Sequence, residues 1–128
     1  MSKNIKNVPT SDYLAVVETV NAYVEGVRQG NPEKVSEAFR DDATMYGFTD
    51  GSLVGGPISN LYSFVKTSGE APNVIARVDI LGIAPTIAVA RVDMENDAVG
   101  ADYTDFHTLL KQDGEWKIVG KVYHQYEK

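Results

Sequence analysis

The chain has 128 residues, of which 43% are hydrophobic and 23% charged, a balance that suits one globular domain and excludes a wholly disordered chain. It contains no cysteine, which excludes disulfides, thiolate metal ligands and a cysteine nucleophile. The net charge of −6, without a basic cluster, argues against nucleic-acid binding.

The N-terminal residues are polar and end at Pro9, and we expect residues 1–10 to form a flexible tail ahead of a single domain over residues 11–128. They lack the apolar core of a secretory signal, and no apolar run in the chain approaches the roughly 20 residues that span a bilayer. We therefore expect a soluble, cytoplasmic protein that does not bind membranes.

Apolar residues at three- and four-residue steps predict a first helix, which Thr10 or Ser11 caps and Gly30 ends. These apolar residues are Leu14, Val17, Val20, Val24 and Val27. Asn31-Pro32-Glu33 predicts the start of a second, short helix, because it joins an N-cap residue, a proline at the first helical position and an acid.

A short strand is predicted over residues 44–48, and the turn sequence Asp50-Gly51 follows it. Gly55-Gly56-Pro57 is expected to start a third helix that ends near Gly69. Beyond Pro72 the chain becomes β-prone, with runs over residues 74–83, 86–95, 99–112 and 115–124 separated by turn sequences. Three helices followed by a four-stranded meander predict an α+β fold, with N-terminal helices packed on a strongly bent antiparallel sheet.

Turn lengths predict which side chains share a face of this sheet. A two-residue type I′ turn at Asp113-Gly114 places Gln112 opposite Glu115, and Tyr103 opposite His124. Two-residue turns at 84–85 and 96–97 extend the register, although Pro85 fits such a turn poorly and bulges are common in bent sheets.

In this register the inner face, which the helices must cover, is apolar around Trp116 and polar at its other end. The polar group comprises Arg77, Asp79, Tyr103, Asp105, His107 and His124, and it faces the small residues Ala88, Ala90 and Gly120. Buried ionisable groups need partners or water, and small residues leave volume, so we expect a cavity with polar walls. The outer face, expected to meet solvent or a partner subunit, carries Arg91, Asp102, Lys117 and Lys121.

The terminal stretch YTDFHTLLKQDGEWKIVGKVYH resembles the NTF2-like (cystatin-like cone) superfamily, and within it the "putative lumazine-binding" and SnoaL-like branches. MYGFTDGSLVGGPISNLYSFV and ARVDILGIAPTIAVARVDMEN extend the likeness to residues 11–126. The resemblance implies a homodimer formed through the outer sheet face, and a ligand that enters the open end of the cone. It does not choose a reaction, because this fold hosts isomerases, cyclases, dehydratases, hydrolases and carriers.

Asp105 and His107 are two residues apart on one strand, so their Cβ atoms lie roughly 6.6 Å apart on one face, and His124 is diagonal to Asp105 at about 7–8 Å. A carboxylate between two imidazoles suits general acid–base chemistry near neutral pH. The resemblance implies proton transfer from an Asp or His in the cone, with a tyrosine hydroxyl on the substrate carbonyl, as in ketosteroid isomerase. Candidate donors are Tyr46, Tyr62 and Tyr103. The alternative is an Asp–His hydrogen bond that only shapes the pocket.

Arg77 and Asp79 are expected to form an ion pair along their strand, with Arg77 also able to meet an acidic ligand at the mouth of the pocket. Trp116 is expected to contribute to its apolar wall. Two histidines without HxxxH or HExxH spacing do not predict a metal site, and no cofactor is predicted.

These observations predict a protein that binds a small organic ligand and acts, without a cofactor, by proton transfer in isomerisation, aldol-type cyclisation or dehydration. Two alternatives stay open: a non-catalytic binding or carrier module, and a dimeric interaction protein whose cavity is filled by side chains.

Overall fold

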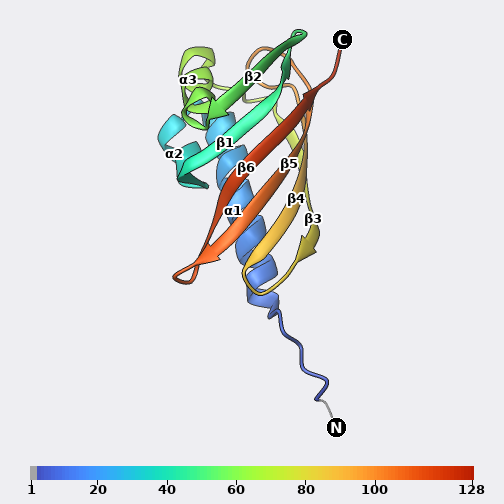
Figure 1. Ribbon diagram of the computed structural model, residues 1–128. Helices are drawn as coiled ribbons and strands as arrows, with labels where there is room; N and C mark the ends of the chain where they lie inside the picture. Colours follow the sequence, from blue (N-terminus) through green and yellow to red (C-terminus); the bar gives the residue numbers. More distant parts are fainter. Residues whose placement is uncertain (1–2) are drawn as a thin grey trace.

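The computed structural model describes residues 3–128. Residues 3–9 lead into the long helix α1 (Thr10–Gln29), which runs along one face of a single curved sheet (Figure 1). The short helix α2 (Pro32–Ser36) and helix α3 (Ser59–Ser68) cover the same face near one end. Within the described residues, no helix is long and apolar enough to cross a membrane.

The sheet has six strands in the order β2-β1-β6-β5-β4-β3, and every neighbouring pair is antiparallel except β1 and β6, which are parallel. The strands are β1 (Phe39–Thr49), β2 (Ser52–Pro57), β3 (Ile75–Ile83), β4 (Ile87–Glu95), β5 (Tyr103–Gln112) and β6 (Glu115–Gln125). The predicted α+β class is confirmed, with β1 and β2 added to the predicted meander.

The predicted helix start at residues 55–57 is wrong, because these residues belong to β2. Asp50 and Gly51 both have positive φ, so their turn folds β2 back onto β1 as a hairpin. A Cβ at Gly55 would lie 2.3 Å from the ring of Tyr46, so glycine is required where that ring crosses β2. Helix α3 therefore begins at Ser59 rather than at the glycines.

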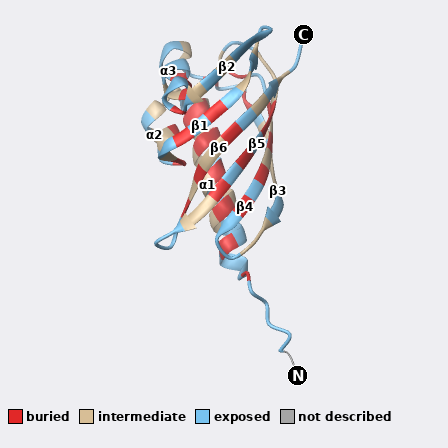
Figure 2. Cartoon of the chain, viewed as in Figure 1, coloured by how far each residue is buried: buried red, intermediate tan, exposed pale blue. Residues whose placement is uncertain are grey.

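The buried residues, red in Figure 2, lie mainly on the helices and on the strands that the helices cover. The predicted apolar stripe of α1 is buried at Val20, Val24 and Val27, but its start is wrong: Leu14 is 66% exposed, whereas Val16 is fully buried.

The predicted end of α1 and start of α2 are confirmed, but the predicted cap by Thr10 or Ser11 is wrong, because α1 begins at Thr10 and its cap residue is Pro9, whose side chain forms no capping hydrogen bond. Gly30 ends α1 in the left-handed conformation, and the Asn31 side chain caps α2 by accepting a hydrogen bond from the Lys34 N–H.

The β5–β6 hairpin contains a bulge that reverses part of the predicted face pattern. Gln112 lies opposite Glu115, as predicted, but the register shifts by one residue between Leu109 and Thr108, so that Thr108 faces Gly120. A one-residue shift sends every later side chain to the opposite face. Lys121 and Tyr123 therefore point toward the helices, and Val122 and His124 point outward.

Strand β3 is also reversed relative to its prediction. Ala90 faces Ile80 rather than Asp79, because the register shifts between Ile80 and Gly82. Arg77 and Leu81 are consequently exposed on the outer face. The loop between β4 and β5, residues 96–102, is longer than predicted, but the register changes by an even number of residues, which leaves the predicted faces of β4 unchanged.

Candidate functional site

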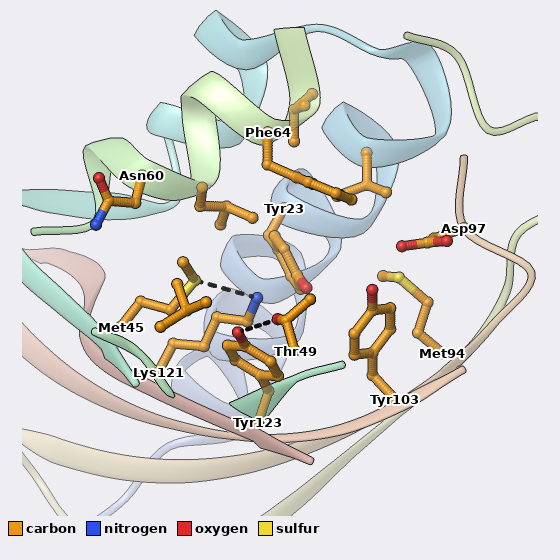
Figure 3. A pocket seen from close by; sticks show the side chains of 14 residues that line it. Tyr23, Met45, Thr49, Asn60, Phe64, Met94, Asp97, Tyr103, Lys121 and Tyr123 are labelled. Atoms are coloured by element: carbon orange, nitrogen blue, oxygen red, sulfur yellow. Dashed lines mark hydrogen bonds between the residues drawn. The ribbon is translucent and has the colours of Figure 1, made fainter. Parts of the chain in front are cut away.

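A cavity of about 170 Å³ lies between helices α1 and α3 and the inner face of the sheet (Figure 3). Most of the cavity wall is apolar and is formed by Val27, Met45, Val54, Leu61, Phe64, Val65 and Met94. The polar groups on the wall belong to Tyr23, Thr49, Asn60, Asp97, Tyr103, Lys121 and Tyr123. An apolar cavity with a few polar groups is typical of small-molecule sites, and about 150 Å³ is enough space for benzene.

Behind this wall, Tyr23 joins the two acid–base residues predicted on β5. The Tyr23 hydroxyl donates a 2.8 Å hydrogen bond to Oδ2 of Asp105, and Nε2 of His107 lies 3.4 Å from the same oxygen. Asp105 is 1% exposed and His107 is fully buried. Among residues 3–128, neither Oδ1 of Asp105 nor Nδ1 of His107 has a hydrogen-bond partner, so Oδ2 carries the whole network.

The burial of this network fixes its protonation states. Burial alone would raise the pKa of Asp105, but the charge of Lys121 and the hydrogen bonds from His107 and Tyr23 outweigh it, and the pKa is lowered. Burial lowers the pKa of His107, although Asp105 opposes this shift. Burial and the Asp105 charge raise the pKa of Tyr23 far above its usual value. Near neutral pH, an ionised carboxylate therefore accepts hydrogen bonds from a neutral imidazole and a neutral phenol.

Lys121 brings an amine to the cavity wall from β6. The residue is 7% exposed, and Nζ lies 5.1 Å from the ring centroids of both Tyr23 and Tyr123. Its hydrogen-bond acceptor is the sulfur of Met45 at 3.7 Å, drawn as a dashed line in Figure 3. Burial lowers the pKa of Lys121, and the charges of Asp105 and Asp97 oppose that shift.

Asp97 and Tyr103 form the opposite part of the wall (Figure 3). The backbone N–H groups of Val99 and Ala101 donate to Oδ1 of Asp97, at 3.0 and 2.9 Å, and so fix this carboxylate in the β4–β5 loop. Burial, followed by the Asp97 charge, raises the pKa of Tyr103, whose hydroxyl therefore stays protonated. A fixed carboxylate thus lies beside a phenol that can donate a hydrogen bond.

The predicted catalytic residues are only partly brought together. Asp105 and His107 point inward and contact each other, as predicted, but they lie behind Tyr23 and do not line the cavity. The predicted position of His124 is wrong, because the bulge turns its side chain to the outer face, where it packs on Tyr126 with ring centroids 4.8 Å apart.

Of the predicted ligand-binding residues, one lines the cavity and the others lie elsewhere. Tyr103 lines the cavity. Arg77 and Asp79 form the predicted ion pair, at 2.9 Å, but on the outer face, so their predicted position in the pocket is wrong.

The remaining three aromatic residues have packing roles outside the cavity wall. Tyr46 is 47% exposed and crosses Gly55, and Tyr62 packs edge-on against Phe39. Trp116 is buried, and its indole N–H lies 3.4 Å from Oδ1 of Asp12.

Sequence reasoning missed Tyr23, Asp97, Lys121 and Tyr123. The sequence alone favours a core or rim position for Tyr23, and it places Asp97 in a two-residue turn. Gly120 was a usable signal for the other two, because a glycine inside a strand often marks a bulge. Gly47 on β1 then provides the space for the Tyr123 ring, which a Cβ at that position would approach to 2.7 Å.

No group of three or more histidine, aspartate or glutamate side chains within residues 3–128 is placed to hold a metal ion.

A pocket between N-terminal helices and the concave face of a curved sheet defines an NTF2-like protein of cystatin-like fold. The chain belongs to the "putative lumazine-binding" family, whose sequence profile matches residues 11–124. It is 38% identical over 121 residues to the aldolase FrzH of Cladobotryum sp., covering 94% of this chain and 97% of that one.

Two solved structures of NTF2-like proteins of unknown function have the same architecture. The protein from Methylobacillus flagellatus KT is 37% identical with a TM-score of 0.87, over 94% of this chain and 96% of that one. The protein from Shewanella baltica OS155 is 34% identical with a TM-score of 0.83, over 96% of this chain and all of that one.

Proposed function

We propose that the protein is an enzyme that removes and returns a proton next to the carbonyl group of a small, partly apolar molecule, in an aldol-type, isomerisation or dehydration reaction. The observation that carries the proposal is the Asp97 carboxylate beside the Tyr103 hydroxyl on the wall of an otherwise apolar cavity. The 38% identity to a protein named an aldolase supports the same class of chemistry.

In this proposal Asp97 is the general base. Two backbone N–H groups hold its Oδ1, and Oδ2 accepts a proton from carbon when the Tyr103 hydroxyl, which hydrogen-bonds the carboxylate, turns to the substrate. The Tyr103 hydroxyl, whose pKa is raised, donates to the carbonyl oxygen and stabilises the enolate that forms. Asp105 and His107 act indirectly, because they lie behind Tyr23: Asp105 accepts a hydrogen bond from the Tyr23 hydroxyl, and His107 contacts the same carboxylate oxygen.

A carrier module would use the same cavity without turnover, and its mostly apolar wall is compatible with that role. The interaction-protein alternative requires a filled cone, and the open volume of about 170 Å³ argues against it.

The test is hydrogen–deuterium exchange at the α-carbon of cyclohexanone and phenylacetone in D₂O, followed by proton NMR with and without protein. Exchange faster than the protein-free rate is expected. Asp97→Asn keeps the Oδ1 acceptor but removes the base, and we expect it to lower the rate about 10²–10⁴-fold, the usual contribution of general acid–base catalysis.

The matched control is Asp79→Asn, which removes a carboxylate from the outer face and leaves the rate unchanged. Thermal stabilisation by both ketones without exchange would instead assign the carrier role. Equal exchange by the wild type and Asp97→Asn would remove Asp97 from the mechanism.

A further inference from the structure

Lys121 is the least satisfied charged side chain on the cavity wall. Its residue is 7% exposed, and among residues 3–128 it forms no ion pair with a carboxylate. The hydrogen-bond acceptor for Nζ is a thioether sulfur, which accepts weakly. Buried lysines are rare unless they are paired, so packing alone does not account for this one.

The surroundings of Nζ act in two directions: burial favours the neutral amine, whereas the neighbouring aromatic rings and carboxylates favour a cation. Removal from water disfavours the ammonium form, which is the usual way in which proteins turn a lysine into a nucleophile. The aromatic faces of Tyr23 and Tyr123, both 5.1 Å from Nζ, favour a delocalised cation at this position. Asp105 lies two residues from His107, which is the cross-strand partner of Lys121. The negative charge of Asp105 raises the pKa of Lys121, in the direction opposite to burial, and so stabilises a cation at Nζ.

We propose that Nζ of Lys121 attacks the carbonyl carbon of an aldehyde or ketone in the cavity and forms a Schiff base. This inference rests on the proposed function, since it names the substrate class and the covalent form in which the α-proton is removed. An enamine then takes the place of the enolate, and the Tyr103 hydroxyl donates to the carbonyl oxygen before that oxygen leaves as water.

The step balances without an oxidant or reductant. The nitrogen lone pair forms the C–N bond, the carbonyl π electrons move to oxygen, and the carbinolamine loses that oxygen as water together with the two amine protons. One further proton, taken up from solvent, makes the product an iminium ion. Its positive charge then draws electrons from the α C–H bond, and Asp97 accepts that proton to leave an enamine. Protonation of the enamine and addition of water return the amine and the carbonyl compound.

Borohydride trapping tests this assignment on the full-length protein. Phenylacetaldehyde and cyclohexanone are the probes, each with sodium cyanoborohydride at neutral pH, which reduces an iminium to a stable secondary amine. Intact mass spectrometry counts the adducts, and peptide mapping locates them. We expect Lys121 to carry the major adduct and each surface lysine less label, because a lowered pKa leaves a larger share of the amine neutral and able to attack a carbonyl.

Lys121→Arg keeps a cation but cannot form a Schiff base, so the major adduct of the wild-type protein should be absent from the mass spectrum of this variant. The matched control is Lys117→Arg on the same strand, whose Nζ bonds the Glu37 carbonyl and which should label as the wild type does. If Lys121→Arg does not fold, the peptide map of the wild-type protein still decides the question.

The two proposals fail in different ways. Label spread evenly over the lysines, together with normal α-proton exchange, overturns the Schiff base and leaves the proton-transfer function. Selective label at Lys121 without exchange supports the Schiff base and overturns the proton-transfer role of Asp97.

Discussion

Lys121 lies directly across the β5–β6 ladder from His107, and both side chains point toward the helices. Two residues along β5, Asp105 faces Tyr123 across the same ladder. The four positions form one patch of the concave face, and the bulge at Val119–Gly120 creates it. Without that bulge, the outer face would carry Lys121 and the inner face would carry His124.

The bulge depends on Gly120. A Cβ there would lie 2.9 Å from Oγ1 of Thr108, so we expect Gly120→Val to lower the free energy of unfolding by about 1–3 kcal/mol through overpacking. Urea denaturation measures the change. In a Thr108→Ala background, the same substitution should cost less, because the contacting atom is gone.

Gly82→Val is the control for this prediction, since a Cβ at Gly82 meets no atom within 4 Å. Equal losses at the two glycines would show that valine at a bulge, rather than the contact with Thr108, causes the effect.

The sequence predicts the fold class because hydrophobic spacing and turn residues are local signals, and the cap at Asn31 and the turn at Asp113-Gly114 are where they were expected. The sequence does not predict which side chains line the site, because a shift of one residue in the pairing of two strands changes which residues face the helices. One bulged residue in β3 and one in β6 reverse the faces of Arg77 and His124. Such a bulge is a property of how two strands pair, here β5 and β6 at Thr108 and Gly120, and the hydrophobic pattern of either strand alone does not reveal it.

Asp105 and His107 were placed correctly because they share β5, where a spacing of two residues fixes one face whatever the neighbouring strand does. Asp97 could not be placed in this way. Its position depends on the length of the β4–β5 loop, in which the N–H groups of Val99 and Ala101 hold the carboxylate.

His107 should make stability depend on pH. Its pKa is lowered in the folded state by burial, so between that value and about 6.5 the unfolded chain binds more protons than the native chain. The free energy of unfolding should therefore fall as pH decreases from 7.5 to 5.5, with a slope that approaches about 1.4 kcal/mol per pH unit. Tyr23, Asp105 and Lys121 face the imidazole, and His107→Gln should flatten the slope.

Urea titrations at several pH values measure this slope. His124→Gln is the control, because His124 is exposed on the outer face and its loss should leave the slope unchanged. If His107→Gln and the wild type lose stability equally over this pH range, the imidazole is not the group that titrates.

Tyr23→Phe should destabilise the protein by about 1–3 kcal/mol, because it removes the 2.8 Å hydrogen bond to a carboxylate that is 1% exposed. Thermal and urea unfolding measure the loss. Tyr46→Phe removes the hydroxyl of a tyrosine that is 47% exposed and should change stability little. A similar small change in both variants would mean that Asp105 does not depend on the Tyr23 hydroxyl.

The outer face of the sheet is the surface on which we expect a second copy of the chain. Phe106 and Val122 are cross-strand partners there, and they are 42% and 51% exposed. Further exposed apolar side chains extend the patch over the sheet: Tyr46, Phe48, Leu53, Ile75, Leu81, Ile87 and Val89. Exposed apolar side chains gathered on one face of a sheet mark an interaction surface more often than single scattered ones do.

Light scattering after gel filtration should therefore give the mass of a dimer for the wild type. Val122→Glu places a charge at the centre of the patch, where desolvation in a dimer would be costly, and should give the mass of a monomer. Leu14→Glu is the control, because Leu14 is 66% exposed on α1, on the opposite side of the sheet. A monomeric wild type, or dissociation caused equally by both substitutions, would rule out dimerisation through the outer face.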